Sequence, residues 1–210
     1  MEKYEMIPLE SGYYRIKALK DFFNVFEGDL GGIIKCSANL SQRGNCWIYP
    51  DAAVIDNARV MDDAKIVSGK VCDNAYVHGK AEIRGNAIIC NDATVCGHAE
   101  VSDFAKVGGH AIVRDYACVL DSAEIAGNVV VDGEACIRGK AYVERLSDYI
   151  VFKNWWSSGR YFTWTRSNNK WKVGCFYGTG AELIKKAYED SEESGKRYEE
   201  IVKYVENIIK

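Results

Sequence analysis

The chain has 210 residues, enough for one large domain or for a main domain with a small appendage. Its 48% hydrophobic and 27% charged residues, without a long apolar run, exclude a disordered chain and a membrane-spanning one. A net charge of −3 gives no whole-chain reason to expect nucleic-acid binding, and residues 1–10 lack the layout of a secretion signal, so we expect a cytoplasmic protein.

Residues 1–45 come before any repeat, and we expect them to form a leader that caps the repeat region. Eight cysteines are spread over the whole chain, and in a reducing compartment we interpret them as small apolar residues. They show no Cys-x-x-Cys spacing, and the chain has neither a glycine-rich phosphate loop nor a serine nucleophile elbow. The sequence therefore predicts no metal and no cofactor.

Residues 46–144 repeat every six positions. A branched aliphatic residue occupies each sixth position from Val77 to Val143, and the same rhythm runs upstream from Ile48 to Ile66 and resumes at Val71 after the loss of one residue. An alanine lies two positions before nearly every one of them, and Gly, Asn, Asp or His residues precede that alanine. This period fits neither a helix nor a simple strand, so the chain must turn a corner in each hexad, and three hexads close a triangular coil of about 18 residues.

We expect the aliphatic and alanine side chains to fill the coils, with Gly, Asn and Asp at corners that need a positive φ. Stacked about 4.8 Å apart as parallel strands, these residues make about five to six coils. A column filled at normal protein density leaves no room for a ligand. Any site is therefore predicted on an outer face, between copies or in the terminal segments.

The hexad pattern resembles the left-handed parallel β-helix of hexapeptide-repeat proteins, the superfamily of trimeric acyltransferases. The leader carries four blocks in a fixed order: RIKALKDF at 15–22, GDLGG at 28–32, ANLSQ at 38–42 and GNCWIY at 44–49. These blocks look like the leader of the YdcK-like β-helix proteins of bacteria and their phages. That family has no assigned activity, so the resemblance implies a fold and not a function.

One outer face of the predicted column carries an apolar ladder, found by taking every eighteenth residue. Its members are Tyr76, Thr94, Ile112 and Val130, with Cys96 beside them. Exposed apolar stripes mark contacts, so we predict that this face meets another copy, and the resemblance to trimeric enzymes favours a homotrimer. The alternative is that a long β surface tolerates scattered aliphatic residues.

Three histidines invite a catalytic or metal-binding interpretation. His98 and His110 fall at different corners, where histidine is a tolerated turn residue, which argues against a shared zinc ion. His78 falls on an outer face and is the one candidate for a general base. The repeat has no inserted loop of the kind that walls the acyl-donor groove in the acyltransferases, so that family's catalytic residues have no counterpart here.

Residues 145–210 predict a small α+β module. Strands are expected at 148–152, 160–165 and 171–176, with turns at Ser157–Gly159 and 167–170. Thr179 and Glu182 form a capping box that opens a helix, and a last helix comes after it with one apolar stripe from Tyr198 to Ile209.

Cations and tryptophans interleave in this tail, whereas the repeat is acidic. This combination suits stacking on bases together with neutralisation of phosphate. The predicted ligand-binding residues are Trp155, Trp156, Arg160, Trp164, Arg166, Lys170, Trp171 and Lys172. The alternative is that the tryptophans form the core of the module and the cations are solubilising surface. Alternation within 160–165 puts aromatic residues on both faces of the strand, so they cannot all be exposed.

From these observations we expect a noncatalytic, oligomeric scaffold whose tail binds a partner protein or a small anionic ligand such as a nucleotide. In a phage this would be an inhibitor or a sequestering protein in the host cytoplasm. An acyltransferase-like enzyme with a site between protomers around His78 is the alternative, and a purely structural repeat with the tail as cap and oligomer lock is a third. We expect no membrane association, and nucleic acid is less favoured than a nucleotide.

Overall fold

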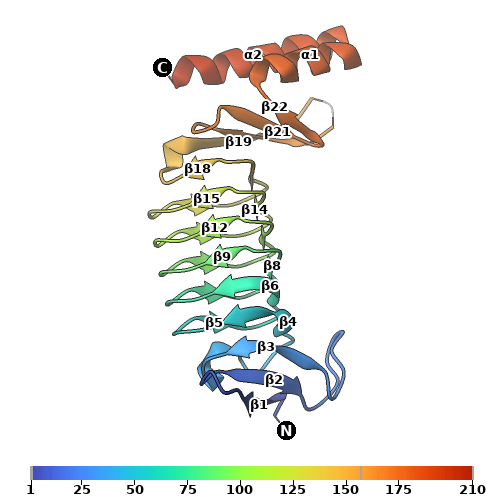
Figure 1. Cartoon of the computed structure of the whole chain (residues 1–210). Coiled ribbons are helices and arrows are strands. Elements are labelled where there is room, and N and C mark those ends of the chain that lie inside the picture. The colour runs from blue at the N-terminus through green and yellow to red at the C-terminus, as the bar shows by residue number, and fades with distance from the viewer. Residues whose placement is uncertain (1, 157, 210) are drawn as a thin grey trace.

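The computed structural model describes residues 2–156 and 158–209 as a tall column with a small module on one end (Figure 1). The leader holds three strands and one 3₁₀ turn. They are β1 (Tyr4–Pro8), β2 (Tyr14–Ala18), β3 (Leu30–Ile34) and η1 (Ser37–Asn39). β1 and β2 pair antiparallel, as do β2 and β3, and β3 then joins the column by pairing parallel with β4.

The column is a β-solenoid of about 6 turns with parallel strands, which confirms a mainly β fold. Most of its strands have only two residues, because a corner interrupts each hexad. They are β4 (Trp47–Val54), β5 (Arg59–Val60), β6 (Lys65–Val71), β7 (Tyr76–Val77), β8 (Glu82–Ile83), β9 (Ile88–Ile89), β10 (Thr94–Val95), β11 (Glu100–Val101), β12 (Lys106–Val107), β13 (Ile112–Val113), β14 (Cys118–Val119), β15 (Glu124–Ile125), β16 (Val130–Val131), β17 (Cys136–Ile137) and β18 (Tyr142–Val143).

These strands stack into three faces. Face 1 consists of β5, β7, β10, β13 and β16, and face 2 of β4, β6, β8, β11, β14 and β17. Face 3 consists of the end of β6 with β9, β12, β15 and β18. The aliphatic residue of each hexad stacks directly on its equivalent in the next coil, as Val77 does on Val95, and both are 0% exposed. The predicted inward aliphatics and alanines therefore form one continuous core, which also takes in leader residues from Tyr4 onward.

The corners use the residues that the repeat supplies. Gly109 has φ +66, and a Cβ built there would lie 2.6 Å from the carbonyl oxygen of Gly127 in the next coil. Asp73 has φ 57, and its Oδ2 accepts a 2.8 Å hydrogen bond from the main-chain N–H of Asn91 in the next coil. Glycine thus serves where coils approach closely, and aspartate or asparagine serves where an oxygen can also tie two coils together.

The module begins with a 3₁₀ turn, which leads into an antiparallel sheet and two helices. Its elements are η2 (Leu146–Asp148), β19 (Tyr149–Lys153), β20 (Tyr161–Thr165), β21 (Lys170–Val173), β22 (Phe176–Gly178), α1 (Gly180–Asp190) and α2 (Glu192–Ile208). The predicted single strand at 171–176 is wrong, because Gly174 (φ +55) turns the chain between β21 and β22. Of the predicted turn at Ser157–Gly159, Ser157 lies outside the described residues. The predicted capping box is confirmed, since Thr179 Oγ1 accepts from the N–H of Glu182 at 3.3 Å and Glu182 Oε2 accepts from the N–H of Thr179 at 2.7 Å.

The module sheet closes the carboxyl-terminal end of the solenoid. In the preceding coil the N–H of Cys118 donates to the carbonyl of Ala135, but the equivalent N–H of Cys136 has no further coil to meet. It donates instead to Thr163 Oγ1 in β20, at 3.0 Å. The N–H of Tyr142 likewise donates to a side-chain hydroxyl, that of Ser167, at 2.7 Å. Hydroxyl groups of the module thus replace the carbonyls of a missing coil.

The leader closes the other end with a buried lysine. Lys3 is 1% exposed, and its ammonium donates to the carbonyl of Cys46 at 2.9 Å. The hydroxyl of Tyr4 donates to the carbonyl of Leu40 at 2.7 Å. Burial lowers the pKa of Lys3, while main-chain carbonyl oxygens, that of Cys46 among them, accept from its ammonium. No helix in the described part of the chain is long and apolar enough to cross a membrane.

Candidate functional site

Face 1 presents the predicted apolar ladder. Tyr76, Thr94, Ile112 and Val130 occupy register positions of β7, β10, β13 and β16, so each side chain stands above the next. Each is half-buried although its outer side faces away from the core. Cys96 follows the ladder in the neighbouring row, and burial raises the pKa of its thiol. The ladder is therefore an apolar strip, and the Cys96 thiol beside it ionises less readily than a free thiol.

The ends of this strip are polar. At the upper end the hydroxyl of Tyr149 in β19 donates to the carbonyl of Val130 at 2.8 Å, and Arg114 pairs with Asp132 at 2.9 Å. At the lower end a surface hollow of 510 Å³ lies beside Arg59 and Tyr76. The apolar stretch is thus limited to the middle coils.

His78 lies next to the ladder and is paired with a carboxylate. Its Nδ1 is 3.6 Å from Asp62 Oδ2, and its ring stacks on Tyr76 with 4.4 Å between centroids. Asp62 Oδ2 also accepts the N–H of Gly79 at 3.1 Å, so this carboxylate is an ordinary corner acceptor. His110 repeats the arrangement, with Nδ1 3.7 Å from Asp92 Oδ2. The histidine–aspartate geometry therefore recurs along the repeat and is not particular to His78.

His98 lies at another corner, and its ring stacks on that of Tyr116 with 4.9 Å between centroids. The three histidines accordingly have three separate sets of neighbours. Within the described residues they do not form a common group of metal ligands.

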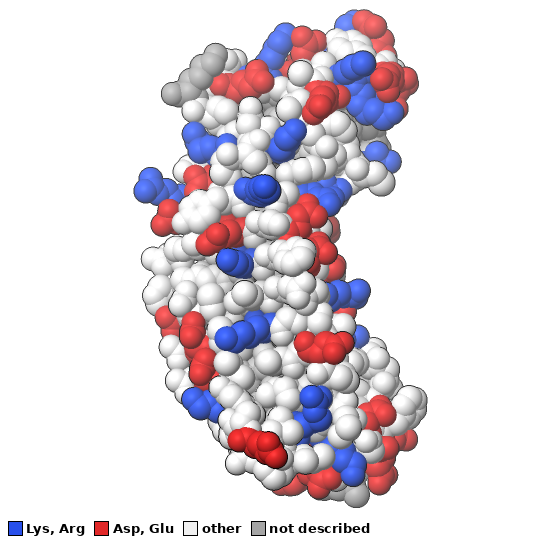
Figure 2. Space-filling model, viewed as in Figure 1, with Lys and Arg blue, Asp and Glu red and all other residues white. Residues whose placement is uncertain are grey.

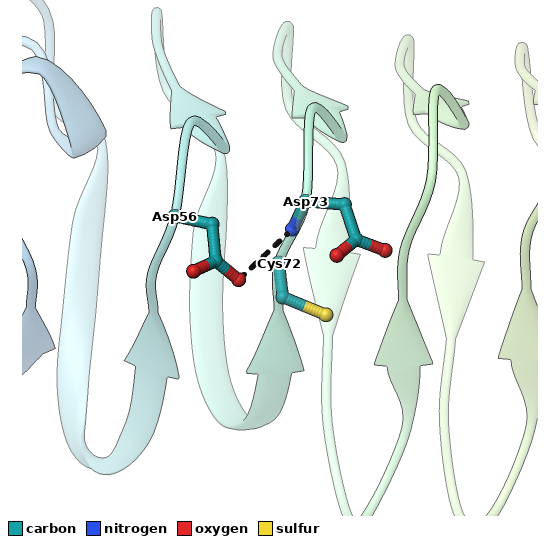
Figure 3. Close-up of side chains that lie close together, drawn as sticks. All are labelled: Asp56, Cys72 and Asp73. Carbon is teal, nitrogen blue, oxygen red and sulfur yellow. Dashed lines mark hydrogen bonds between the residues drawn. The ribbon is translucent and has the colours of Figure 1, made fainter.

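The acidic corners bring one group of ligand-type atoms together. Ligand atoms of Asp56, Cys72 and Asp73 lie within 4.8 Å of one another (Figure 3). Asp56 Oδ2, however, accepts the N–H of Asp73 at 3.3 Å, and the carboxylate of Asp73 accepts that of Asn91. Burial also raises the pKa of the Cys72 thiol, which opposes its use as a thiolate ligand. We interpret these carboxylates as ties between coils and assign no metal to them.

The predicted ligand-binding tryptophans are divided between the core and the surface. Trp164 and Trp171 are each 1% exposed and lie between the module sheet and its helices, so neither offers a free face for stacking. Trp156 is half-buried and makes an edge contact with Tyr198 at 6.1 Å between centroids. Trp155 is 79% exposed. Of the four, Trp155 alone presents its ring to solvent.

The four predicted cations contact different parts of the module. Arg166 donates to the carbonyls of Ser147 and Ile209, at 3.1 and 3.3 Å. Lys170 is 3.9 Å from the carboxylate of Glu182, and Lys172 donates to the carbonyl of Gly174. Arg160 lines a separate hollow of 130 Å³ together with Lys186.

The structure therefore does not bring the eight predicted residues to one surface. Figure 2 agrees, since Lys and Arg side chains are interspersed with Asp and Glu on the face in view and form no single-sign patch.

A surface between β19 and α2 brings together two of the predicted ligand-binding residues, Trp155 and Trp156, with residues of the last helix that sequence analysis did not single out. Two adjoining hollows of 240 and 380 Å³ share Phe152, Glu200 and Ile201. The smaller is bordered by Trp155 and the larger by Tyr204, which is 64% exposed. We call this surface the module groove. The sequence contained one indication of this groove. Beside the inward stripe that contains Val202 and Val205, the last helix has a second row of apolar side chains, formed by Ile201, Tyr204 and Ile208.

No protein-family model matches the chain, and none of the curated proteins matches it.

Proposed function

We propose that the chain is a noncatalytic scaffold that assembles with copies of itself through face 1 and binds a partner protein or a small anionic ligand through its carboxyl-terminal module. The observation that carries this proposal is the in-register ladder Tyr76, Thr94, Ile112 and Val130. A strip of stacked apolar side chains can pack against further copies of the chain without any rearrangement of the backbone.

We also propose a handedness for the solenoid, a related family and a number of copies in the assembly. The hexad of alanine and branched aliphatic residues supports left-handed turns of the hexapeptide-repeat type, and the ordered leader blocks support a YdcK-like protein of bacterial or phage origin. By the same resemblance the assembly is a homotrimer. It would act in the cytoplasm, or in the host cytoplasm as an inhibitor or sequestering protein if a phage encodes it.

The experiment for self-association is sedimentation of an Ile112→Lys variant. Ile112 lies in the middle of the ladder, so three lysines would meet at the proposed interface, and we expect trimers of the wild type and monomers of the variant. Leu120→Lys is the matched control, because Leu120 is an equally half-buried aliphatic beside face 2. Equal sedimentation of wild type and Ile112→Lys would reject face 1 as the interface.

The binding role of the module is tested by denaturing the purified protein and analysing the released small molecules by mass spectrometry. Thermal-shift screening with nucleotides complements this, because a ligand that binds only the folded state raises the melting temperature. Arg160 and Lys186 line one hollow together with a single carboxylate, that of Asp190, and these two cations are the groups we expect an anion to contact. An Arg160→Gln variant would then lose the shift.

A second candidate function is acyl transfer with His78 as the general base. The observation in its favour is that His78 lies beside the carboxylate of Asp62, as a general base lies beside an orienting group, although His110 and Asp92 share this arrangement. A stabilising effect of acyl-coenzyme A, together with acyl transfer lost in His78→Ala and retained in His110→Ala, would support it. Transfer that survives His78→Ala would remove it.

A further inference from the structure

The connection between β2 and β3 projects from the amino-terminal end of the column (Figure 1). Two of its aromatic side chains point into solvent, since Phe23 is 69% exposed and Phe26 is 63% exposed. We call residues 19–29 the Phe loop. The rest of the chain leaves much of the apolar surface of this loop uncovered.

The Phe loop is ordered, and its order holds Phe23 in an unfavourable conformation. Phe22 and Val25 exchange main-chain hydrogen bonds of 3.0 and 2.9 Å, which forces a two-residue turn. The carboxylates of Asp21 and Asp29 accept further main-chain N–H groups of the loop, each at 2.8 Å. Phe23 occupies this turn with φ 48, where glycine or asparagine is the usual residue.

Within one chain, the contacts of the exposed Phe23 ring offset little of this backbone strain. The ammonium of Lys65 lies 4.2 Å from the ring centroid, but at an exposed site such a contact contributes little. Strained residues of this kind persist where a function retains them, so we take the exposed ring of Phe23 as a candidate contact for another molecule.

The module groove has the complementary properties. Phe152, Ile201 and Tyr204 form its apolar wall. Two cations and one carboxylate border it, because Glu200, which lies 3.9 Å from Arg197, joins Lys153 and Arg197. The Phe loop carries three carboxylates, those of Asp21, Glu27 and Asp29, and one cation, Lys20. The loop therefore has a net negative charge and the border of the groove a net positive one, so the two are complementary in sign. The loop lies at the amino-terminal end of the column and the groove at the opposite end, so the two cannot meet within one copy (Figure 1).

We propose that the Phe loop of one copy inserts into the module groove of a second copy, and that two copies exchange this contact reciprocally in an antiparallel pair. In a reciprocal pair both Phe loops and both module grooves are occupied, so the contact closes on itself. In a head-to-tail arrangement one Phe loop and one module groove would remain unoccupied. This contact is separate from face 1 and does not rest on the proposed trimer.

The test uses two double variants of the full chain and their mixture. Phe23→Ser with Phe26→Ser removes the projection, and Trp155→Ser with Tyr204→Ser alters the groove. For each double variant alone, we expect sedimentation experiments to show a dissociation constant of the pair that is at least about 100-fold higher than that of the wild type. The two variants mixed should pair with each other, because one intact projection then meets one intact groove. Pairing restored by mixing identifies a loop-in-groove contact and excludes loop–loop or groove–groove pairing.

Controls separate this contact from unfolding and from face 1. All four side chains are exposed, so the variants should keep the wild-type melting temperature, and Phe104→Ser, which removes a 63% exposed phenylalanine from a solenoid corner, should pair like wild type. The series is run in the Ile112→Lys background, where face 1 does not contribute. Three results would each overturn the proposal: pairing of the Phe23/Phe26 variant as strong as in the wild type, no stronger pairing on mixing, or no pair at all in that background. These results count whatever Ile112→Lys does to the trimer.

Discussion

Thr163→Val tests the idea that the module supplies the hydrogen bonds of a missing coil. Valine has nearly the same shape as threonine but cannot accept the N–H of Cys136, and Thr163 is only 2% exposed. The hydrogen bond is part-buried, and a fully buried donor that loses its acceptor costs about 1–3 kcal/mol, so we expect a loss of up to this size. The melting temperature of a chain of this size should then fall by about 2–4 °C for each kcal/mol.

Ser167→Ala is the matched control. It removes the equivalent acceptor for the N–H of Tyr142, but at an exposed site where water can replace the hydroxyl. We expect a change of at most about 0.5 kcal/mol. Urea denaturation gives both free energies of unfolding, and hydrogen exchange measured by mass spectrometry reports whether the last coil opens. Equal destabilisation by the two variants, or unchanged protection of the Cys136 amide in Thr163→Val, would refute the reasoning.

Two further predictions concern the corners. Gly109→Ala should lower the free energy of unfolding more than Gly133→Ala. Both glycines have a positive φ, whose strain alone is about 1–2 kcal/mol, but only at Gly109 would the new Cβ meet the next coil, at 2.6 Å from a carbonyl oxygen. A thermal melt of each variant checks the order. The pKa of Asp121 is lowered, chiefly by its hydrogen bond to Arg138. The folded-state pKa therefore lies below the unfolded one, so this contribution to stability is present above the unfolded pKa and is lost as the pH falls through the folded pKa. Asp121→Asn should flatten the acid side of the stability–pH curve, and an unchanged acid side would contradict this assignment.

Much of the column could be predicted because the repeat is strictly periodic. Once each hexad places an aliphatic residue and an alanine inward, residues 18 apart must stack, and the ladder from Tyr76 to Val130 results without further information. The corner residues could be predicted too, since glycine and aspartate at fixed places in the hexad match the positive φ found there.

The module could be predicted only in outline. Its strands, capping box and helices are local features, so propensity and spacing indicate them, but they did not indicate the turn at Gly174 within the expected strand 171–176. Alternation showed that the aromatic residues could not all be exposed, yet it could not tell which side of β20 would face the helices. That choice, which buries Trp164, depends on where α1 and α2 pack.

The sequence by itself determined the triangular column, its register and its outward rows, because these depend on contacts between neighbouring copies of one short pattern. Tertiary structure alone decided which hydroxyls close the last coil, which tryptophans enter the core, and how Phe152 and Tyr204 come to share a groove. Those arrangements join segments that are far apart and do not repeat, and their positions are set by the packing of whole elements.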